Sequence, residues 1–427
     1  MQIEELYKIY LKHPSVQTDT RLLKKDDIFF ALKGPNFNGN QFAKQALDSG
    51  ASYVVVDEDP GFADARLIKV GDTLEALQQL ALYHRKQFQI PFIAITGSNG
   101  KTTTKELVHA VLSTTYVTYT TQGNLNNHIG IPLTILRIGL DAEFAVIEMG
   151  ANHQKEIEGY CKIARPTHGI ITNVGKAHLE GFGGIEGVKK GKGELYDFLR
   201  AEDGTAFVMW DYDYLRDMSK GINRIVTYGT ADASVTGIAN KSEPFLEIKM
   251  TSGLDIPVFQ TRLVGSYNLP NVLAAATVGK YFKVDKEKIK SALVQYEPTN
   301  SRSQLIEKNG NRIILDAYNA NPSSMKLAVE NFSKQQGEKV LFLGAMKELG
   351  DESRSEHKNL VDMIGKFDWS DVVLVGPEFE GLNQGYRHFT SAKDALEWLK
   401  SNPVKNSMVL IKGSRSIRME TLLDAFS

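Results

Sequence analysis

Residues 90–112, IPFIAITGSNGKTTTKELVHAVL, decide the fold of this chain. The apolar run IPFIAI predicts a buried strand, and the spacing of apolar residues in KELVHAVL predicts a helix. Between the two, Gly97 and Gly100 allow the backbone to curl so that its N–H groups point at an anion. Lys101 can reach the outer phosphates of a nucleotide, and the Thr102 hydroxyl suits Mg²⁺. The stretch therefore predicts a loop that binds a nucleoside triphosphate.

This loop is shorter than the common P-loop, which has four residues between its two glycines. Only Ser98 and Asn99 separate the glycines here. A turn that binds no phosphate is the alternative, and the strand and helix on either side argue against it. The candidate nucleotide-binding residues of the loop are Gly97, Ser98, Asn99, Gly100, Lys101, Thr102 and Thr103.

Composition and charge bound the class of protein. The chain has 427 residues, of which 42% are apolar and 24% charged, so it is long enough for about two or three globular domains. Lys and Arg number 50 against 51 Asp and Glu, which leaves a formal net charge of −1. Because no overall field attracts nucleic acid or anionic lipid, local groups must hold any anionic ligand.

The sequence carries no marker of export or membrane insertion. Cys161 is the only cysteine, which excludes an intramolecular disulfide and agrees with a reducing compartment. The first residues, MQIEELYKIYLKHP, include acids and lack an apolar signal-peptide core. No stretch approaches the roughly 20 apolar residues that span a bilayer. We expect a cytoplasmic protein.

Three successive domains are expected, all of the α/β class. Residues 1–88 hold apolar runs and a helical pattern over 74–88, which indicate a small N-terminal α/β domain. In residues 89–297, short apolar runs alternate with helices, which is typical of a P-loop ATPase-like parallel sheet with ligand groups at the carboxyl ends of its strands. The alternation begins again in residues 298–427 and predicts a doubly wound, Rossmann-like domain. Strands are expected at 28–32, 53–56, 92–95, 145–149, 169–172, 312–315, 340–343, 372–375 and 408–411, with a less regular strand-rich stretch over 205–264 and a helix over 268–282.

Two polar residues are expected at strand ends beside the phosphate loop. Glu148 lies at the end of one apolar run, where a carboxylate can hold or orient Mg²⁺. His178 follows the next run, again at a carboxyl end. Each has an alternative interpretation, which is a solvated acid for Glu148 and a hydrogen-bonded structural histidine for His178. Taken singly, the histidine is better explained by the structural interpretation.

Lys192 stands in an unusual place for a lysine. It lies on the same helical stripe as the apolar residues Val188 and Leu195. Burial disfavours the charged form of a lysine, so its pKa would fall and its neutral amine could add carbon dioxide to give a carbamate, an anionic metal ligand. The alternative is a side chain that snorkels to the surface, and spacing alone favours that alternative.

Two further candidates lie in the last domain. Asp316 ends its first expected strand, where an acid can accept a hydrogen bond from a ribose hydroxyl. The alternative is an Asx turn, which the Asn and Pro residues that follow would favour. Arg415 follows the last expected strand and could bind a carboxylate or phosphate, with a solvated loop arginine as the competing interpretation.

Taken together, these segments resemble the Mur ligase family over almost the whole chain. They are long and occur in the family's order, and the short phosphate loop is itself typical of the family. The segments are TDTR (18–21), FFALKGPNFNGNQF (29–42), TGSNGKTTTKE (96–106), GNLNNHIGIPLTIL (123–136), IEMGAN (147–152), NVGKAHLEGFGG (173–184), KGKGE (190–194), GSYNLPNVLAAA (265–276), DAYNANPSSM (316–325) and KGSRSIRME (412–420).

The resemblance implies an ATP-dependent amide ligase of peptidoglycan synthesis. It implies that the first domain holds the uridine nucleotide end of the substrate, the middle domain is the ATPase, and the last closes over ATP and receives the amine. The implied reaction activates UDP-N-acetylmuramoyl-tripeptide as an acyl phosphate, which D-alanyl-D-alanine attacks with release of ADP and phosphate. The segments NLNNHIG and DAYNANPSSM favour this activity over a ligase that adds the third residue or a folylpolyglutamate synthase. A nucleotide-binding scaffold without chemistry is the alternative from another class, and the retained motif residues argue against it.

Matching the family's motifs gives the candidates implied roles. Lys101 would contact the transferred phosphoryl group. Two Mg²⁺ sites are implied, with Thr102 and Glu148 at the first and His178 at the second, and Lys192 aligns with a lysine that relatives carry as a carbamate. The remaining implied contacts are adenine for Asn271, ATP phosphates for Arg302, ribose for Asp316, the uridine nucleotide for Thr20 and Arg21, and the reacting groups for Asn127.

Three positions depart from the family's pattern. Ala345 stands where an aspartate is usual, and Tyr267 and Asn40 stand where histidine is frequent. These departures bear on the placement of nucleotide and substrate rather than on the class of reaction. The implied partners are small molecules, with no nucleic acid and no membrane insertion, and we expect a monomer.

Overall fold

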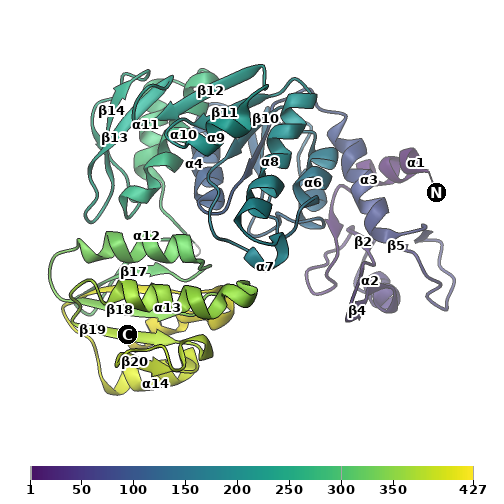
Figure 1. Cartoon of the computed structure of the whole chain (residues 1–427). Helices are drawn as coiled ribbons and strands as arrows, with labels where there is room; N and C mark the ends of the chain where they lie inside the picture. Colours follow the sequence, from purple (N-terminus) through teal and green to yellow (C-terminus); the bar gives the residue numbers. More distant parts are fainter. Residues whose placement is uncertain (1, 300, 427) are drawn as a thin grey trace.

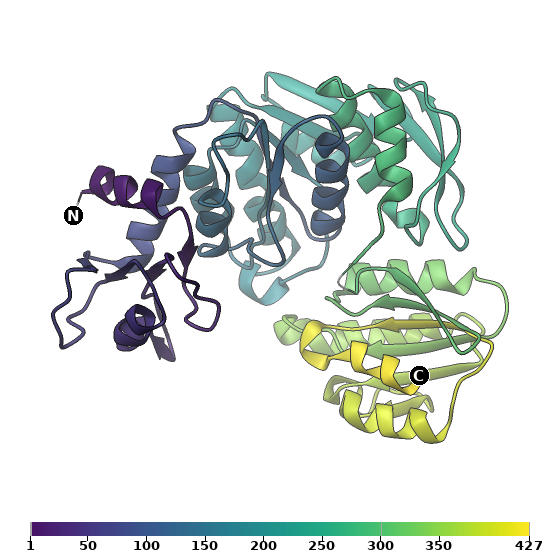
Figure 2. The same ribbon diagram turned by 180° about the vertical axis from the view of Figure 1, so that it is seen from behind.

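Three main sheets follow one another along the chain in the computed structural model, which describes residues 2–299 and 301–426. Figure 1 shows the central domain with the N-terminal domain to its right and the C-terminal domain below it, and Figure 2 shows the same arrangement from behind. Each sheet is accompanied by helices, which confirms the α/β class expected from the sequence. Within the two described ranges, no helix is long and apolar enough to cross a membrane.

The N-terminal domain is built on a parallel sheet of order β1-β2-β5-β6. Its middle strands β2 and β5 are apolar and almost wholly buried, because α1 and α3 pack on one side and the small residues of α2 on the other. The elements are α1 (Ile3–Lys12), β1 (Val16–Gln17), β2 (Ile28–Phe30), β3 (Lys33–Gly34), β4 (Phe37–Asn38), α2 (Ala43–Asp48), β5 (Tyr53–Val56), β6 (Leu67–Lys69) and α3 (Thr73–Arg85).

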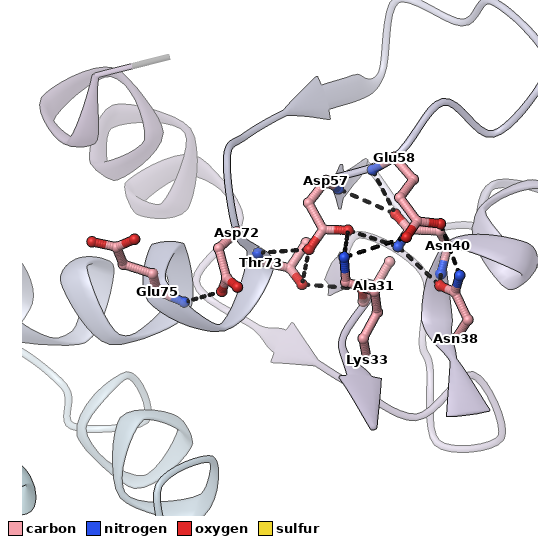
Figure 3. A network of polar contacts seen from close by, with 9 residues as sticks. All are labelled: Ala31, Lys33, Asn38, Asn40, Asp57, Glu58, Asp72, Thr73 and Glu75. Atoms are coloured by element: carbon pink, nitrogen blue, oxygen red, sulfur yellow. Dashed lines mark hydrogen bonds and ion pairs between the residues drawn. The ribbon is translucent and has the colours of Figure 1, made fainter. Parts of the chain in front are cut away.

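A network of hydrogen bonds and ion pairs connects the loops at the carboxyl end of this first sheet (Figure 3). The Asp57 carboxylate, 1% exposed, accepts from Asn40 Nδ2 at 2.8 Å and from the Thr73 N–H at 3.2 Å, and Lys33 Nζ lies 3.3 Å from it. Asn40 Oδ1 in turn accepts from the Asp57 N–H at 3.1 Å. The network ties the β3–β4 hairpin to β5 and to the start of α3, so Asn40 has a structural role here.

The central sheet has the order β15-β14-β13-β12-β11-β10-β7-β9-β8 and is parallel from β8 to β13. Strands β7, β9 and β11 are buried along their whole length, as expected for a parallel sheet covered by helices. Their bounds, with those of the other strands, are β7 (Phe92–Thr96), β8 (Thr118–Thr120), β9 (Phe144–Glu148), β10 (His168–Ile171), β11 (Thr205–Met209), β12 (Arg224–Gly229), β13 (Val235–Lys241), β14 (Glu247–Ser252) and β15 (Phe259–Gln260). The helices are α4 (Lys101–Ser113), α5 (Gly130–Ile135), α6 (Glu156–Ala164), α7 (Leu179–Phe182), α8 (Ile185–Ala201), α9 (Asp213–Ser219), α10 (Leu269–Tyr281) and α11 (Lys286–Gln295).

The C-terminal sheet has the order β16-β17-β21-β18-β19-β20, with β16 antiparallel at one edge. The sequence predicts the four inner strands, but neither edge strand, because both lack a continuous apolar run. The elements are β16 (Gln304–Lys308), β17 (Asn311–Asp316), α12 (Pro322–Ser333), β18 (Lys339–Gly344), α13 (Ser353–Ile364), β19 (Asp371–Val375), β20 (Arg387–Phe389), α14 (Ala392–Ser401), β21 (Met408–Lys412) and a 3₁₀ helix (Met419–Phe426).

The central and C-terminal domains meet at the carboxyl ends of their parallel strands. Figure 1 shows α12 as the helix of the C-terminal domain nearest the central domain. Asn321, which caps α12, donates from Nδ2 to Asn99 Oδ1 at 2.8 Å, and Lys176 pairs with Glu356 at 2.5 Å. Ligand-binding loops cluster at carboxyl ends in sheets of this type, so both domains direct such loops into the same space.

Candidate active site

A cavity of about 720 Å³ lies between the central and C-terminal domains. Its wall includes the phosphate loop from residue 98 to residue 103, the end of β9, and the loop at residues 126–128. The start of α10 and residues along the length of α12 form other parts of the wall. The cavity is thus assembled from segments more than 200 residues apart in the sequence.

The phosphate loop has the backbone geometry that its glycines predict. Gly97 has φ +144° and Gly100 has φ +77°, which lie in the region that favours glycine. A Cβ at Gly97 would lie 2.0 Å from Thr172 Oγ1. Helix α4 begins directly after the loop at Lys101 with no side-chain cap, so the N–H groups of its first turn remain available to an anion.

Lys101 folds back over this loop. Its Nζ donates to the carbonyl of Gly97 at 2.7 Å and of Ser98 at 3.3 Å. Burial lowers the pKa of Lys101, and the charge of Glu148 opposes that shift. The ammonium group therefore lies beside the loop, where an incoming phosphate can replace backbone carbonyls as its partner.

Glu148 has one oxygen that is bonded and one that is free. The side chain is 2% exposed and lies at the end of β9, next to β7 in the sheet. Oε1 accepts from Asn126 Nδ2 at 2.7 Å, whereas Oε2 is buried without a hydrogen-bond partner. Buried carboxylate oxygens are rarely left without a partner. The Thr102 hydroxyl lines the same cavity, so the residues fit a Mg²⁺ ion, which suits a carboxylate and a hydroxyl.

The described residues contain no cluster of three or more His, Cys, Asp or Glu side chains placed to hold a metal ion. Mg²⁺ does not need such a cluster, because it commonly keeps several waters and takes the rest of its ligands from one or two carboxylates and substrate phosphates. The donor set is therefore that of a metal–nucleotide site rather than a metal cage made only of protein.

His178 contacts the C-terminal domain in this arrangement. Its Nδ1 lies 2.5 Å from Glu348 Oε2, and the backbone at His178 has φ +52°. The contact with His178 lowers the pKa of Glu348, although the angles at Nδ1 are not those of a hydrogen bond. The histidine lines the cavity, as the sequence predicts, but its ring nitrogen is engaged by a carboxylate that the sequence analysis did not identify.

Lys192 is buried, which rules out the snorkelling alternative. Its side chain is 1% exposed, Nζ donates to the Ala151 carbonyl at 3.1 Å, and it lies 5.0 Å from the Phe182 ring centroid. Burial, reinforced by the charge of Lys101, lowers the pKa of Lys192 well below 10.5. Ala151 lines the cavity, so the amine lies directly behind its wall.

Two other lysines of the described chain are as deeply buried, and they differ from Lys192 in one respect. Lys105 pairs with Glu106 at 2.5 Å, and Lys412 pairs with Asp316 at 2.5 Å. The described contacts of Lys192 include no carboxylate ion pair; the nearby Glu194 accepts from backbone N–H groups instead. A buried lysine without such a partner is the one whose neutral form is favoured.

The remaining nucleotide-binding candidates, Asn271 and Arg302, also line the cavity. Asn271 accepts from the Thr104 hydroxyl at 3.1 Å and donates to Asn268, and within the described residues its second N–H has no hydrogen-bond partner. The guanidinium carbon of Arg302 lies 3.7 Å from the Tyr318 ring centroid, and its buried Nε has no partner. These groups lie where a base and its phosphates would meet the phosphate loop.

Both carboxylate oxygens of Asp316 have partners. Oδ2 pairs with Lys412, and Oδ1 accepts from the Ser303 N–H at 3.2 Å. The Asx-turn alternative is therefore wrong, because the side chain bonds to a neighbouring strand and to the interdomain segment rather than to the residues that follow it. Tyr267, one of the departures from the family, donates to or accepts from Ser303 Oγ at 3.0 Å in the same segment.

The substrate-binding candidates divide into those near the cavity and those far from it. Asn127 lines the cavity, and its Oδ1 accepts from the N–H groups of Ile129 and Gly130. Thr20 and Arg21 lie in the β1–β2 loop outside the cavity wall, and the Arg21 side chain is 85% exposed and paired with Asp19. Arg415 is exposed and is also absent from the wall.

Sequence reasoning missed Asn126, Glu348 and Lys412. Asn126 stands beside the predicted Asn127, and an amide next to a candidate ligand was the available signal. No local pattern marks Glu348 or Lys412, because their partners come from another domain and another strand. Ala345, where an aspartate is usual, is buried, and its N–H donates to the Val375 carbonyl at 2.8 Å.

Three family models match successive parts of the chain. Residues 14–85 match "Mur ligase family, catalytic domain", residues 95–279 match "Mur ligase middle domain", and residues 301–415 match "Mur ligase, glutamate ligase domain". The matched segments correspond to the three sheets.

Relatives match over nearly the whole chain. The UDP-N-acetylmuramoyl-tripeptide–D-alanyl-D-alanine ligase of Bacillus subtilis (strain 168) is 35% identical over 424 residues, which cover 96% of this chain and 92% of that protein. The crystal structure of MurF from Acinetobacter baumannii has a TM-score of 0.87 at 32% identity, covering 96% and 93% of the two chains. MurF ligase from Thermotoga maritima in complex with ADP has a TM-score of 0.86 at 28% identity, covering 97% of each chain.

Proposed function

Because the chain belongs to the Mur ligase family, we propose that it joins D-alanyl-D-alanine to UDP-N-acetylmuramoyl-tripeptide in an ATP-dependent reaction. The observation that carries the proposal is the match over 96% of the chain with a relative named for this reaction. The cavity supports it, because a phosphate loop and a buried carboxylate with a free oxygen face the same space. The product would be a precursor of peptidoglycan.

The reaction consists of two displacements. The terminal carboxylate of the tripeptide attacks the γ-phosphorus of ATP, an O–P bond forms, and the bond to ADP breaks to leave an acyl phosphate. The neutral amine of D-alanyl-D-alanine then attacks the acyl carbon, a C–N bond forms, phosphate departs, and the amine loses a proton. Anions must approach each other in the first step, so charge neutralisation and orientation are the main tasks of the protein.

The residues of the cavity divide these tasks. Lys101 and the N–H groups that begin α4 would hold the phosphates, and Arg302 would add a second cation from the interdomain segment. Asn271 would meet the adenine with its remaining N–H bond, and Asp316 would accept from the ribose. Since these groups come from two domains, closure of the C-terminal domain over ATP completes the nucleotide site.

Thr102 and Glu148 would hold a first Mg²⁺ ion through the hydroxyl and the free Oε2, and His178 would serve a second after its separation from Glu348. Bound there, the metal would neutralise phosphate charge. The chain's own part is to orient the Glu148 carboxylate, because the hydrogen bond from Asn126 occupies Oε1 and leaves Oε2 without a partner.

We also propose that Lys192 is carbamylated. Its neutral amine would attack the carbon of CO₂, an N–C bond forms, and the proton released leaves a carbamate anion. Two features of the described contacts of Lys192 support this step: burial lowers the pKa of its amine, and the amine donates to the Ala151 carbonyl rather than to a carboxylate. Incubation with ¹³C-bicarbonate should give a carbamate carbon signal by NMR in the native protein and none in Lys192→Gln; a signal of equal intensity in both would contradict the assignment.

The division of labour among domains follows the three sheets. We propose residues 1–88 as the binding domain for the uridine nucleotide end, with Thr20 and Arg21 at the edge of its sheet, and residues 89–297 as the ATP-binding domain. Residues 298–427 would receive D-alanyl-D-alanine, whose carboxylate Arg415 would bind. We also propose that the chain acts as a monomer in the cytoplasm. Sedimentation equilibrium should give the mass of one chain.

The test of function is an ADP-release assay with three substrate sets. Turnover is expected with UDP-N-acetylmuramoyl-tripeptide and D-alanyl-D-alanine. Turnover that occurs only with the dipeptide precursor and a diamino acid would assign the chain to third-residue addition, and turnover only with a folate and glutamate would assign it to folylpolyglutamate synthesis. Either result would overturn the proposal while the ligase class survived.

A further inference from the structure

Lys105 is a buried cation that the proposed mechanism does not use. It lies on α4, one turn beyond Lys101 and Thr102, and its side chain is 1% exposed. Nζ donates to Glu106 Oε1 at 2.5 Å and to the Thr121 carbonyl at 2.7 Å. A buried ammonium group is costly unless partners compensate it, and an apolar side chain would pack in the same place without that cost. The presence of a lysine at this buried position therefore needs an explanation, and its two partners suggest one.

Thr121 connects Lys105 to the strand that carries Glu148. The residue follows β8 and is fully buried. Its N–H donates to the Val146 carbonyl at 3.1 Å, and its Oγ1 accepts from the Glu148 N–H at 3.0 Å. The backbone of Glu148 is therefore fixed by a residue whose own carbonyl is held by the ammonium of Lys105.

The segment that begins at Thr121 also controls the Glu148 side chain. Five residues later, Asn126 Nδ2 donates to Glu148 Oε1, and the Asn126 carbonyl accepts from the Gly150 N–H at 2.8 Å. These contacts occupy Oε1 and leave Oε2 free toward the cavity. Thr121 thus contacts the backbone of Glu148, and Asn126, in the segment that follows it, contacts the side chain.

We propose that Lys105 is a positioning residue for the metal site. Its hydrogen bond holds α4, which carries Thr102, against the segment that contacts Glu148. The Thr102 hydroxyl and the free Glu148 oxygen would thereby keep the separation that a metal ion requires. The ammonium group suits this task because a charge-assisted hydrogen bond is directional as well as strong, whereas apolar packing permits a slide along the helix. The inference rests on the proposed function, since it takes Thr102 and Glu148 as the metal ligands.

The test measures metal binding rather than turnover. Mn²⁺ replaces Mg²⁺ as a paramagnetic probe, and its binding to the full-length protein with saturating ADP is followed by EPR. Lys105→Met keeps the length and apolar part of the side chain and is expected to raise the Mn²⁺ dissociation constant about tenfold, the low end of the loss usually seen when outer supports of a metal site are removed. The affinity for ADP without metal should change less than twofold. Lys288→Met, at an exposed lysine of α11, is the matched control.

A second variant keeps the test decisive if Lys105→Met does not fold. Thr121→Val removes only the hydroxyl that accepts from the Glu148 N–H and should weaken Mn²⁺ binding in the same direction. Both substitutions act on the same chain of contacts to Glu148. The double variant should therefore lose less Mn²⁺ affinity than the product of the two single fold-changes. A lowered melting temperature with Mn²⁺ affinity within twofold of the native protein would overturn the positioning role. If the native protein bound no Mn²⁺ with ADP, the metal site of the proposed function would fail instead.

Discussion

Replacement of Lys192 by methionine should change how the stability of the central domain depends on pH. Methionine has a similar length and is apolar, so it fills the space beside Phe182 without an ionisable group. It leaves the Ala151 carbonyl without its donor, at a cost of about 1 kcal/mol that does not vary with pH. The pH-dependent part of the difference in free energy of unfolding between the native protein and the variant therefore reports the ionisation of Lys192 alone.

The sign follows from proton binding. Burial lowers the pKa of Lys192 in the folded protein well below its unfolded value of 10.5, so between those two values the unfolded chain binds more protons than the folded one. The native protein must then gain stability as pH rises through this window, relative to Lys192→Met. The slope of the free energy of unfolding against pH approaches about 1.4 kcal/mol per pH unit where Lys192 is neutral in the folded protein and protonated in the unfolded chain.

The assay is urea unfolding in CO₂-free buffer, followed by the fluorescence of Trp210, which lies in the central domain. Trp369→Phe and Trp398→Phe in both proteins remove the signal of the C-terminal domain. Adding bicarbonate back should change the urea unfolding midpoint of the native protein but not that of Lys192→Met. Parallel pH profiles for the two proteins would refute the reasoning, because Lys192 would then carry its proton in the folded state as in the unfolded one.

Three other substitutions test the cavity. Gly97→Ala should weaken ATP binding at least tenfold by calorimetry, because its Cβ would lie 2.0 Å from Thr172 Oγ1. Glu148→Gln keeps the shape but removes the charge, and should raise the Mg²⁺ concentration for half-maximal ADP release about 100-fold. Asp316→Asn leaves the buried Lys412 without a carboxylate and should lower the free energy of unfolding of the C-terminal domain by about 3 kcal/mol in urea.

Each of these expectations has an outcome that contradicts it. Native ATP affinity in Gly97→Ala would mean that the loop can shift away from Thr172. An unchanged Mg²⁺ requirement in Glu148→Gln would remove Glu148 from the metal site. If Asp316→Asn were as stable as the native protein while ADP affinity fell, the aspartate would contact the nucleotide without any need for the Lys412 pair.

Short-range patterns predicted much of the fold. The strands at residues 92–95, 145–149 and 340–343 were expected because a buried parallel strand needs a continuous apolar run, and each is present within about a residue of the expected bounds. The edge strands β16 and β20 were missed. An edge strand is stabilised by one neighbour and need not be apolar throughout, so its pattern does not stand out from a loop.

The sequence by itself determined the phosphate loop, the class of fold and the family, because glycines, a lysine and a strand–helix pair act over a few residues, and the family's motifs are long. It also placed Lys192 on an apolar stripe. Only the tertiary structure decided that Lys192 is buried without a carboxylate pair in the described contacts, that Glu148 keeps one oxygen free, and that Glu348 engages His178. These properties depend on which distant segments of the chain come into contact. Long-range packing decides those contacts, and they produce no periodic pattern in the sequence.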